Sequence, residues 1–259
     1  MNTIFPTELT QRVGCQGCQQ SAPLSFDFTF AYQPIVNVTK RSVFAHEALI
    51  RGLAGESAFS ILSQVNDQNR YRFDQKCRTH AIALAAQLNM QERLSINFLP
   101  NAVYRPELCI RSTLEAAERH RFPLTNLIFE TVESEQVSEN RHLANILHEY
   151  RQFGFMTAID DFGAGHSGLN LLADFQPDLI KLDMGLIRNI NQDRPRQVIV
   201  RGIVNICQEL GVQVIAEGVE TPSERDCLRD IGIHLMQGYL FAKPTLEALA
   251  TLDSQAWAS

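Results

Sequence analysis

Two adjacent carboxylates, Asp160 and Asp161, end an apolar run in the segment 157–167, which reads TAIDDFGAGHS. Successive strand residues point to opposite faces, so these two acids can reach different partners only if the backbone turns there. Gly163 and Gly165 follow directly and allow that turn. An acidic pair at the end of a buried strand suits an oxygen cage for divalent cations. The alternative at this point is a polar turn in which Asp161 caps the next helix.

The elements that must position these acids follow a regular rhythm from residue 28 onward. Apolar runs of strand length alternate with amphipathic runs of helix length, and the first two strands are joined too closely for a helical crossover, so they must be antiparallel. The pattern predicts an α/β fold, a modified (β/α)8 TIM-type barrel with an antiparallel first strand. A doubly wound open sheet is the alternative, but no GxGxxG or P-loop follows its early strands. The expected strands are 28–38, 43–51, 94–99, 127–131, 155–161, 178–183, 212–217 and 234–241.

Helix signals fill the intervals between these strands. Helices are expected over 58–67, 72–89, 112–120, 138–154 and 169–175. Pro195 and Gly211 bound a further helix as its first turn and its stop. Thr221, Pro222 and Glu224 form a capping box for the last helix, which Gly232 ends.

Polar residues stand where the strands end, which is where barrels of this kind carry out their chemistry. Five carboxylates and two amides would converge there with only Lys181 and Arg51 to balance the acids, so the acids would repel one another unless cations intervene. Oxygen ligands without a histidine cluster favour magnesium or manganese over zinc. Lys181 is explained equally well as a structural ion-pair partner in the barrel. In chain order the residues are Glu47, Asn97, Glu130, Asp160 with Asp161, Lys181, Glu217 and Gln237.

Eight short motifs in a fixed order resemble the EAL-domain family of bacterial phosphodiesterases, and they cover residues 28–244. This resemblance implies hydrolysis of cyclic di-GMP to linear pGpG, which lowers the level of that second messenger. The alternative is a non-catalytic cyclic di-GMP receptor of the same fold that acts through protein partners. The motifs are QPIV at 33–36, EALIR at 47–51, IN at 96–97, FETVES at 129–134, DDFGAG at 160–165, IKLD at 180–183, AEGVET at 216–221 and QGYLFAKP at 237–244.

The resemblance also implies a role for each site residue. Two Mg2+ or Mn2+ ions per site would activate a water for in-line attack on phosphorus, and Lys181 would orient that water or neutralise charge in the transition state. Gln33 and Arg51 would contact the nucleotide, Gln237 would support the water, and Glu133 would anchor the loop 162–171. One ion would be held by Glu47, Asn97, Glu130 and Asp160, and the second by Asp160, Asp161 and Glu217.

Three positions depart from the pattern of the family. Gly52 replaces a common aromatic residue and affects the expected base stacking. Ala164 and His166 replace the common threonine and tyrosine of the loop and affect its regulation. None of the expected metal ligands is missing.

Composition narrows the remaining possibilities. A net charge of -6 argues against a protein that coats a nucleic acid polymer or an anionic membrane. The absence of a signal-like or membrane-spanning segment predicts no membrane insertion and a cytoplasmic location, and the resemblance implies a homodimer. Residues 1–25 are expected to form an N-terminal extension and 26–259 the phosphodiesterase domain. Within the extension, Cys15 and Cys18 form half of a zinc site, a redox pair or incidental thiols.

Overall fold

The computed structural model describes residues 21–103, 105–132, 140–165, 168–252 and 257. Cys15, Cys18, Glu133 and His166 lie outside these residues, so the boundary at residue 25 and the roles of the two cysteines and of Glu133 stay predictions. No helix in the described ranges is long and apolar enough to span a membrane.

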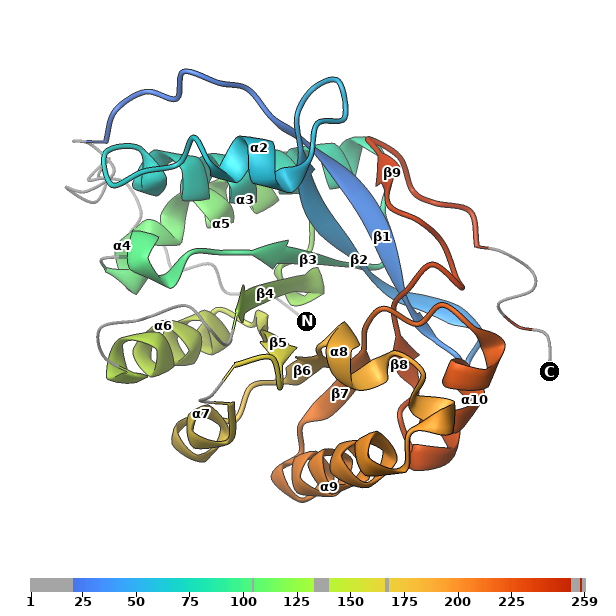
Figure 1. Cartoon of the computed structure of the whole chain (residues 1–259). Helices are drawn as coiled ribbons and strands as arrows, with labels where there is room; N and C mark the ends of the chain where they lie inside the picture. The colour runs from blue at the N-terminus through green and yellow to red at the C-terminus, as the bar shows by residue number, and fades with distance from the viewer. Residues whose placement is uncertain (1–20, 104, 133–139, 166–167, 253–256, 258–259) are drawn as a thin grey trace.

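A closed barrel organises the chain (Figure 1). The hydrogen-bonded order of the strands is β2-β3-β4-β5-β6-β7-β8-β1, and an additional pairing of β1 with β2 completes the ring. A ninth strand, β9 (Thr245–Leu246), pairs with β1 beside the ring. The strands of the ring are β1 (Thr29–Asn37), β2 (Ser42–Arg51), β3 (Arg93–Asn97), β4 (Leu127–Val132), β5 (Met156–Phe162), β6 (Leu179–Leu182), β7 (Gln213–Ala216) and β8 (Leu235–Met236).

The reversed first strand is confirmed. β1 runs antiparallel to β2, β8 and β9, whereas every other neighbouring pair, from β2–β3 to β7–β8, is parallel. A short turn between β1 and β2 enforces this reversal, with Arg41 in the left-handed region at φ 50° and the Asn37 carboxamide accepting a hydrogen bond from the backbone N–H of Lys40 at 2.9 Å. Antiparallel strands can be joined by such a turn, but parallel strands cannot.

The helices lie around the outside of the barrel (Figure 1). α2 and α3 cover the side formed by β1 to β3, while α9 and α10 lie on the opposite side beside β7 and β8. Their bounds are α2 (Ala58–Leu62), α3 (Arg70–Gln87), α4 (Pro106–Cys109), α5 (Arg111–His120), α6 (Asn140–Gln152), α7 (Gly168–Asp174), α8 (Met184–Ile187), α9 (Arg194–Leu210) and α10 (Pro222–Ile231), with 3-10 turns at Pro100–Ala102, Leu124–Asn126 and Ile190–Gln192.

Two expected elements are much shorter than predicted. The expected helix over 58–67 ends at Leu62, and the expected strand over 234–241 is reduced to the two residues of β8. After β8 the backbone turns over Val219, whose carbonyl accepts from Leu240 N–H at 3.1 Å. Gly238 makes this approach possible, because a Cβ there would lie 2.0 Å from the Val219 carbonyl oxygen. Periodicity could not reveal this contact, because it joins residues from two loops.

Three helix ends follow the local signals in the sequence. The Asp193 side chain caps α9 by accepting from the Arg196 N–H at 3.0 Å, and Gly211 ends this helix at φ 72°. The predicted capping box of α10 is present, with Thr221 and Glu224 bonded reciprocally, which satisfies N–H groups that an α-helix leaves without partners.

Glu224 extends this cap into a buried junction. Its carboxylate accepts backbone N–H bonds from Asn189 at 2.8 Å and from Glu220 and Thr221 at 3.0 Å each, and the residue is only 4% exposed. Burial by itself would raise the pKa of Glu224, but these hydrogen bonds outweigh it and lower the pKa below 4.5. The carboxylate therefore stabilises the fold above pH 4.5, and this contribution is lost as the pH falls through the lower folded-state pKa.

We expect Glu224→Ala to lower the free energy of unfolding by about 2 kcal/mol at pH 7, because three backbone N–H groups lose the buried carboxylate that accepts from them. The difference from wild type should begin to shrink below about pH 4.5 and should be lost as the pH falls through the lower folded-state pKa, where the folded wild-type carboxylate becomes protonated. Urea unfolding at pH 7 and in this acid range measures both effects. Glu209→Ala, at an exposed carboxylate on α9, is the matched control, and an equal loss in both variants would contradict the assignment.

Candidate metal and phosphodiester site

An apolar layer fills the interior of the barrel below the site. It consists of one buried side chain from each of seven strands, namely Ile35, Ala45, Ile128, Ala158, Leu179, Ile215 and Leu235. Residues two apart on a strand share a face, so the residue two positions away from each of these apolar side chains also points into the barrel. We call the end of the barrel at the carboxyl ends of the parallel strands its upper end, and the apolar layer lies directly below it.

Six of these seven apolar residues are followed, two positions on, by a polar residue of the site. The carboxylates and the lysine predicted from the sequence therefore occupy a single layer directly above the apolar residues. On the reversed strand β1 the order is inverted, and Gln33 precedes Ile35. The pairs on the other strands are Ala45 and Glu47, Ile128 and Glu130, Ala158 and Asp160, Leu179 and Lys181, Ile215 and Glu217, and Leu235 and Gln237.

Asp161 joins the same site because the backbone turns at this residue. Its φ is 54°, and the pairing of β5 with β6 is irregular between Ile159 and Phe162. The Asp161 N–H donates to Asp160 Oδ1 at 3.0 Å. The turn thus begins at Asp161 itself, two residues before Gly163 (φ 96°). A left-handed aspartate is strained, and such strain is concentrated at functional sites.

Lys181 lies at the centre of the acidic layer. Its Nζ is 3.2 Å from Glu47 Oε2, 3.0 Å from Glu130 Oε2, 3.1 Å from Asp160 Oδ1 and 2.8 Å from Glu217 Oε1. The side chain is fully buried, and although burial alone would lower the pKa of Lys181, the surrounding carboxylates raise it well above its usual value. Lys181 therefore stays an ammonium ion.

The carboxylates lack sufficient positive charge within the described residues. Burial raises the pKa of Glu130 to about 8, with Glu47 and Asp160 adding repulsion, and burial likewise raises the pKa of Glu217 well above its usual value. Burial and then the Asp160 carboxylate raise the pKa of Asp161. Bringing several acids together without enough cations produces shifts in this direction.

Two groups of three carboxylates share Asp160. Ligand oxygens of Glu47, Glu130 and Asp160 lie within 4.8 Å of one another, and the same holds for Asp160, Asp161 and Glu217. These five acids around one ammonium carry four uncompensated negative charges when ionised, which is the charge that two divalent cations would balance. The donor set therefore fits two oxygen-liganded divalent ions with Asp160 between them.

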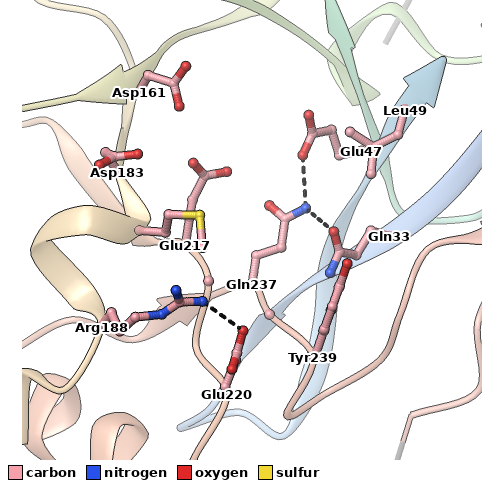
Figure 2. A pocket seen from close by; sticks show the side chains of 13 residues that line it. Gln33, Glu47, Leu49, Asp161, Asp183, Arg188, Glu217, Glu220, Gln237 and Tyr239 are labelled. Carbon is pink, nitrogen blue, oxygen red and sulfur yellow. Dashed lines mark hydrogen bonds and ion pairs between the residues drawn. The ribbon is translucent and has the colours of Figure 1, made fainter. Parts of the chain in front are cut away.

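Amides connect the acids to the neighbouring strands. Gln237 Nε2 donates to Glu47 Oε2 at 2.8 Å and to Gln33 Oε1 at 3.2 Å (Figure 2), and Asn97 Nδ2 donates to Glu47 Oε1 at 3.1 Å. The Oε1 atom of Gln237 is buried and has no hydrogen-bond partner among the described residues. It is thus available to accept a hydrogen bond from a molecule in the site.

A cavity of about 430 Å3 opens beside these side chains (Figure 2). Besides Gln33, Glu47, Asp161, Glu217 and Gln237, it is lined by residues to which the sequence had assigned no role. Asp183 caps α8 through Gly185 N–H at 2.8 Å, and Arg188 forms an ion pair with Glu220 at 3.2 Å. No local pattern signals that pair, because it joins two loops. The lining residues without a predicted role are Leu49, Asp183, Met184, Arg188, Gly218, Glu220, Gly238 and Tyr239.

Ser95 was also missed, although the alternation of β3 could have found it. It lies two residues before Asn97 on the same face, and its hydroxyl donates to Glu130 Oε1.

Arg51 lies at the end of β2, where its guanidinium donates to the Ile50 carbonyl at 2.7 Å. In the described part of the chain Arg51 does not line the cavity, so its contact with a nucleotide stays a prediction.

The family model described as "EAL domain" matches residues 19–244. Among curated relatives, the blue light- and temperature-regulated antirepressor BluF of Escherichia coli K12 is 34% identical over 88% of this chain and 56% of its own length. The probable cyclic di-GMP phosphodiesterase PdeG of the same organism is 30% identical over 82% of this chain and 44% of its own length. The chain thus spans about half the length of these relatives.

Solved structures agree with the fold. A standalone versatile EAL protein from Vibrio cholerae O395, in a c-di-GMP bound form, has a TM-score of 0.89 and 53% identity, covering 92% of this chain and all (100%) of that chain. Klebsiella pneumoniae BlrP1, in a complex with manganese and cyclic di-GMP, has a TM-score of 0.80 and 38% identity, covering 87% of this chain and 59% of that chain.

Proposed function

The chain belongs to the EAL domain family, and from that premise we propose that it is a metal-dependent phosphodiesterase that hydrolyses cyclic di-GMP to linear pGpG. The observation that carries the proposal is the pair of carboxylate groups sharing Asp160 around the buried Lys181. Relatives named as cyclic di-GMP phosphodiesterases support the same reaction.

The residues that would hold the cations divide between two sides of Asp160. Glu47, Glu130 and Asp160 with Asn97 would hold one ion, and Asp160, Asp161 and Glu217 the other. Mg2+ or Mn2+ fits these ligands, because they are all oxygen donors. When bound, the two ions supply Lewis acidity that activates water and neutralises charge on the phosphodiester.

The side chains of the chain itself perform the remaining tasks. Lys181 keeps its proton and places a fixed positive charge beside the reacting phosphate, where it stabilises the charge that develops in the transition state. Gln237 is held by Glu47 and Gln33 and accepts an O–H of the attacking water at its free Oε1 atom. Gln33 and Arg51 would contact the nucleotide, and Glu133, which lies outside the described residues, would anchor the loop after Asp161.

The direct test is incubation of the purified chain with cyclic di-GMP and Mn2+ or Mg2+, with products resolved by chromatography. We expect pGpG to appear with metal and not in a matched sample containing a chelator. Undiminished hydrolysis after thorough chelation would contradict the metal mechanism. Binding without any cleavage would contradict the enzyme assignment.

One comparison favours a second candidate function. BluF is named as an antirepressor rather than as a phosphodiesterase, which favours a receptor of this fold that holds cyclic di-GMP and acts through a protein partner. The carboxylate set argues for catalysis, because binding alone does not need it. The proposal also includes a homodimer in the cytoplasm, and sedimentation of the purified chain tests the dimer.

A further inference from the structure

Charge is distributed unevenly around the cavity of Figure 2. Five of its lining residues are acids, namely Glu47, Asp161, Asp183, Glu217 and Glu220, whereas within the described part of the chain Arg188 is the one cation that lines it. Cations held by the carboxylates would balance the charge at that end. The other end, near Glu220 and Tyr239, has only Arg188 to attract an anion.

The guanidinium of Arg188 can exchange Glu220 for another anion. Its Nη2 lies 3.2 Å from Glu220 Oε1, and the two side chains are 54% and 47% exposed. Exposed ion pairs contribute little to stability because water competes for both charges. A phosphate that enters the cavity can therefore replace Glu220 at the guanidinium at small cost. Two of its oxygens can accept from the guanidinium, where Glu220 accepts from Nη2 through Oε1.

The base of Arg188 is fixed, in contrast to its tip. The Arg188 N–H donates to the Met184 carbonyl at 2.9 Å at the end of α8. The next residue, Asn189, is left-handed at φ 57°, and its N–H is bonded to the buried Glu224 carboxylate at 2.8 Å. The junction capped by Glu224 thus directs the guanidinium toward the cavity, where Figure 2 shows it below Glu217.

Cyclic di-GMP carries two phosphates, and hydrolysis opens only one of them. We propose that Arg188 leaves Glu220 and binds the phosphate that is not cleaved, so that it selects diesters with a second anionic group. This inference rests on the proposed function. It makes Arg188 a substrate-binding residue that acts apart from the carboxylates and Lys181.

The test compares Arg188→Gln with Arg201→Gln, which removes the same charge from an exposed position on α9 that does not line the cavity. Calorimetry in chelator measures binding of cyclic di-GMP without turnover. We expect Arg188→Gln to weaken binding by about 10- to 100-fold, the loss typical of one charge-assisted hydrogen-bonded contact. Arg201→Gln should bind as wild type does, and Arg188→Lys should recover part of the loss.

Kinetics with Mn2+ provide the second measurement. Arg188→Gln should raise KM for cyclic di-GMP and leave kcat within about threefold, because the contact is equal in ground and transition states. Turnover of bis(p-nitrophenyl) phosphate, a diester with a single phosphate, should not change. Unchanged affinity, or an equal loss of turnover on both diesters, would overturn the role of Arg188. A wild-type chain that neither binds nor cleaves cyclic di-GMP would overturn the proposed function and this inference with it, and that result is visible before any variant is compared.

Discussion

Asp160→Asn should lower kcat for cyclic di-GMP by about 10³-fold or more, the largest effect we expect from any single substitution. Asp160 belongs to both carboxylate groups, so its replacement removes an anionic ligand from both proposed cation positions. An amide keeps the shape of the side chain but has only one acceptor oxygen and no charge. The Asp160 Oδ1 contacts with Lys181 and with the Asp161 N–H would weaken as well.

The measurement is single-turnover hydrolysis in Mn2+ together with a titration of Mn2+ binding. Both affinity for the metal and turnover should fall in Asp160→Asn. Asp174→Asn, at an exposed carboxylate at the end of α7, controls for the loss of one negative charge. Wild-type affinity for two ions in Asp160→Asn would show that Asp160 is not shared between them.

Lys181→Met should destabilise the metal-free chain by about 3–5 kcal/mol, the cost of breaking a buried ion pair by removing one partner. The loss is large because the ammonium contacts four carboxylates that have no other cation close by in the described structure. Turnover should fall by about 10²–10³-fold, because a fixed positive charge beside the phosphate is lost.

Urea unfolding in chelator, repeated with Mn2+, separates the two roles of Lys181. We expect added Mn2+ to recover much of the stability of Lys181→Met, since divalent ions replace the missing charge, while turnover stays low. Lys40→Met, at an exposed lysine in the turn between β1 and β2, is the control. If Lys181→Met retained full turnover, Lys181 would be only a structural ion-pair partner.

The alternation of strand-length and helix-length runs predicted most of the fold, and the position of polar residues at the strand ends predicted most of the site. Strand and helix rhythm gave the barrel and the reversed β1, because a strand pair joined by a short turn has no other arrangement. Most residues at the upper ends of the strands were also identifiable, since six of them follow an inward apolar residue by two positions, as Asp160 follows Ala158. Alternation is a local property of a strand, so the sequence alone contains it.

The contacts between loops could not be predicted from the sequence. The end of β8 depends on the approach of Gly238 to Val219, and the pairing of Arg188 with Glu220 joins the segments after β6 and β7. The shifted pKa of Glu130 and the central position of Lys181 likewise depend on distances between residues of different strands. The sequence by itself determined which residue types stand at the upper end of the barrel. The tertiary structure alone decided the distances between these residues. Those distances place five carboxylates around one ammonium ion, and so they set the negative charge that bound cations would balance.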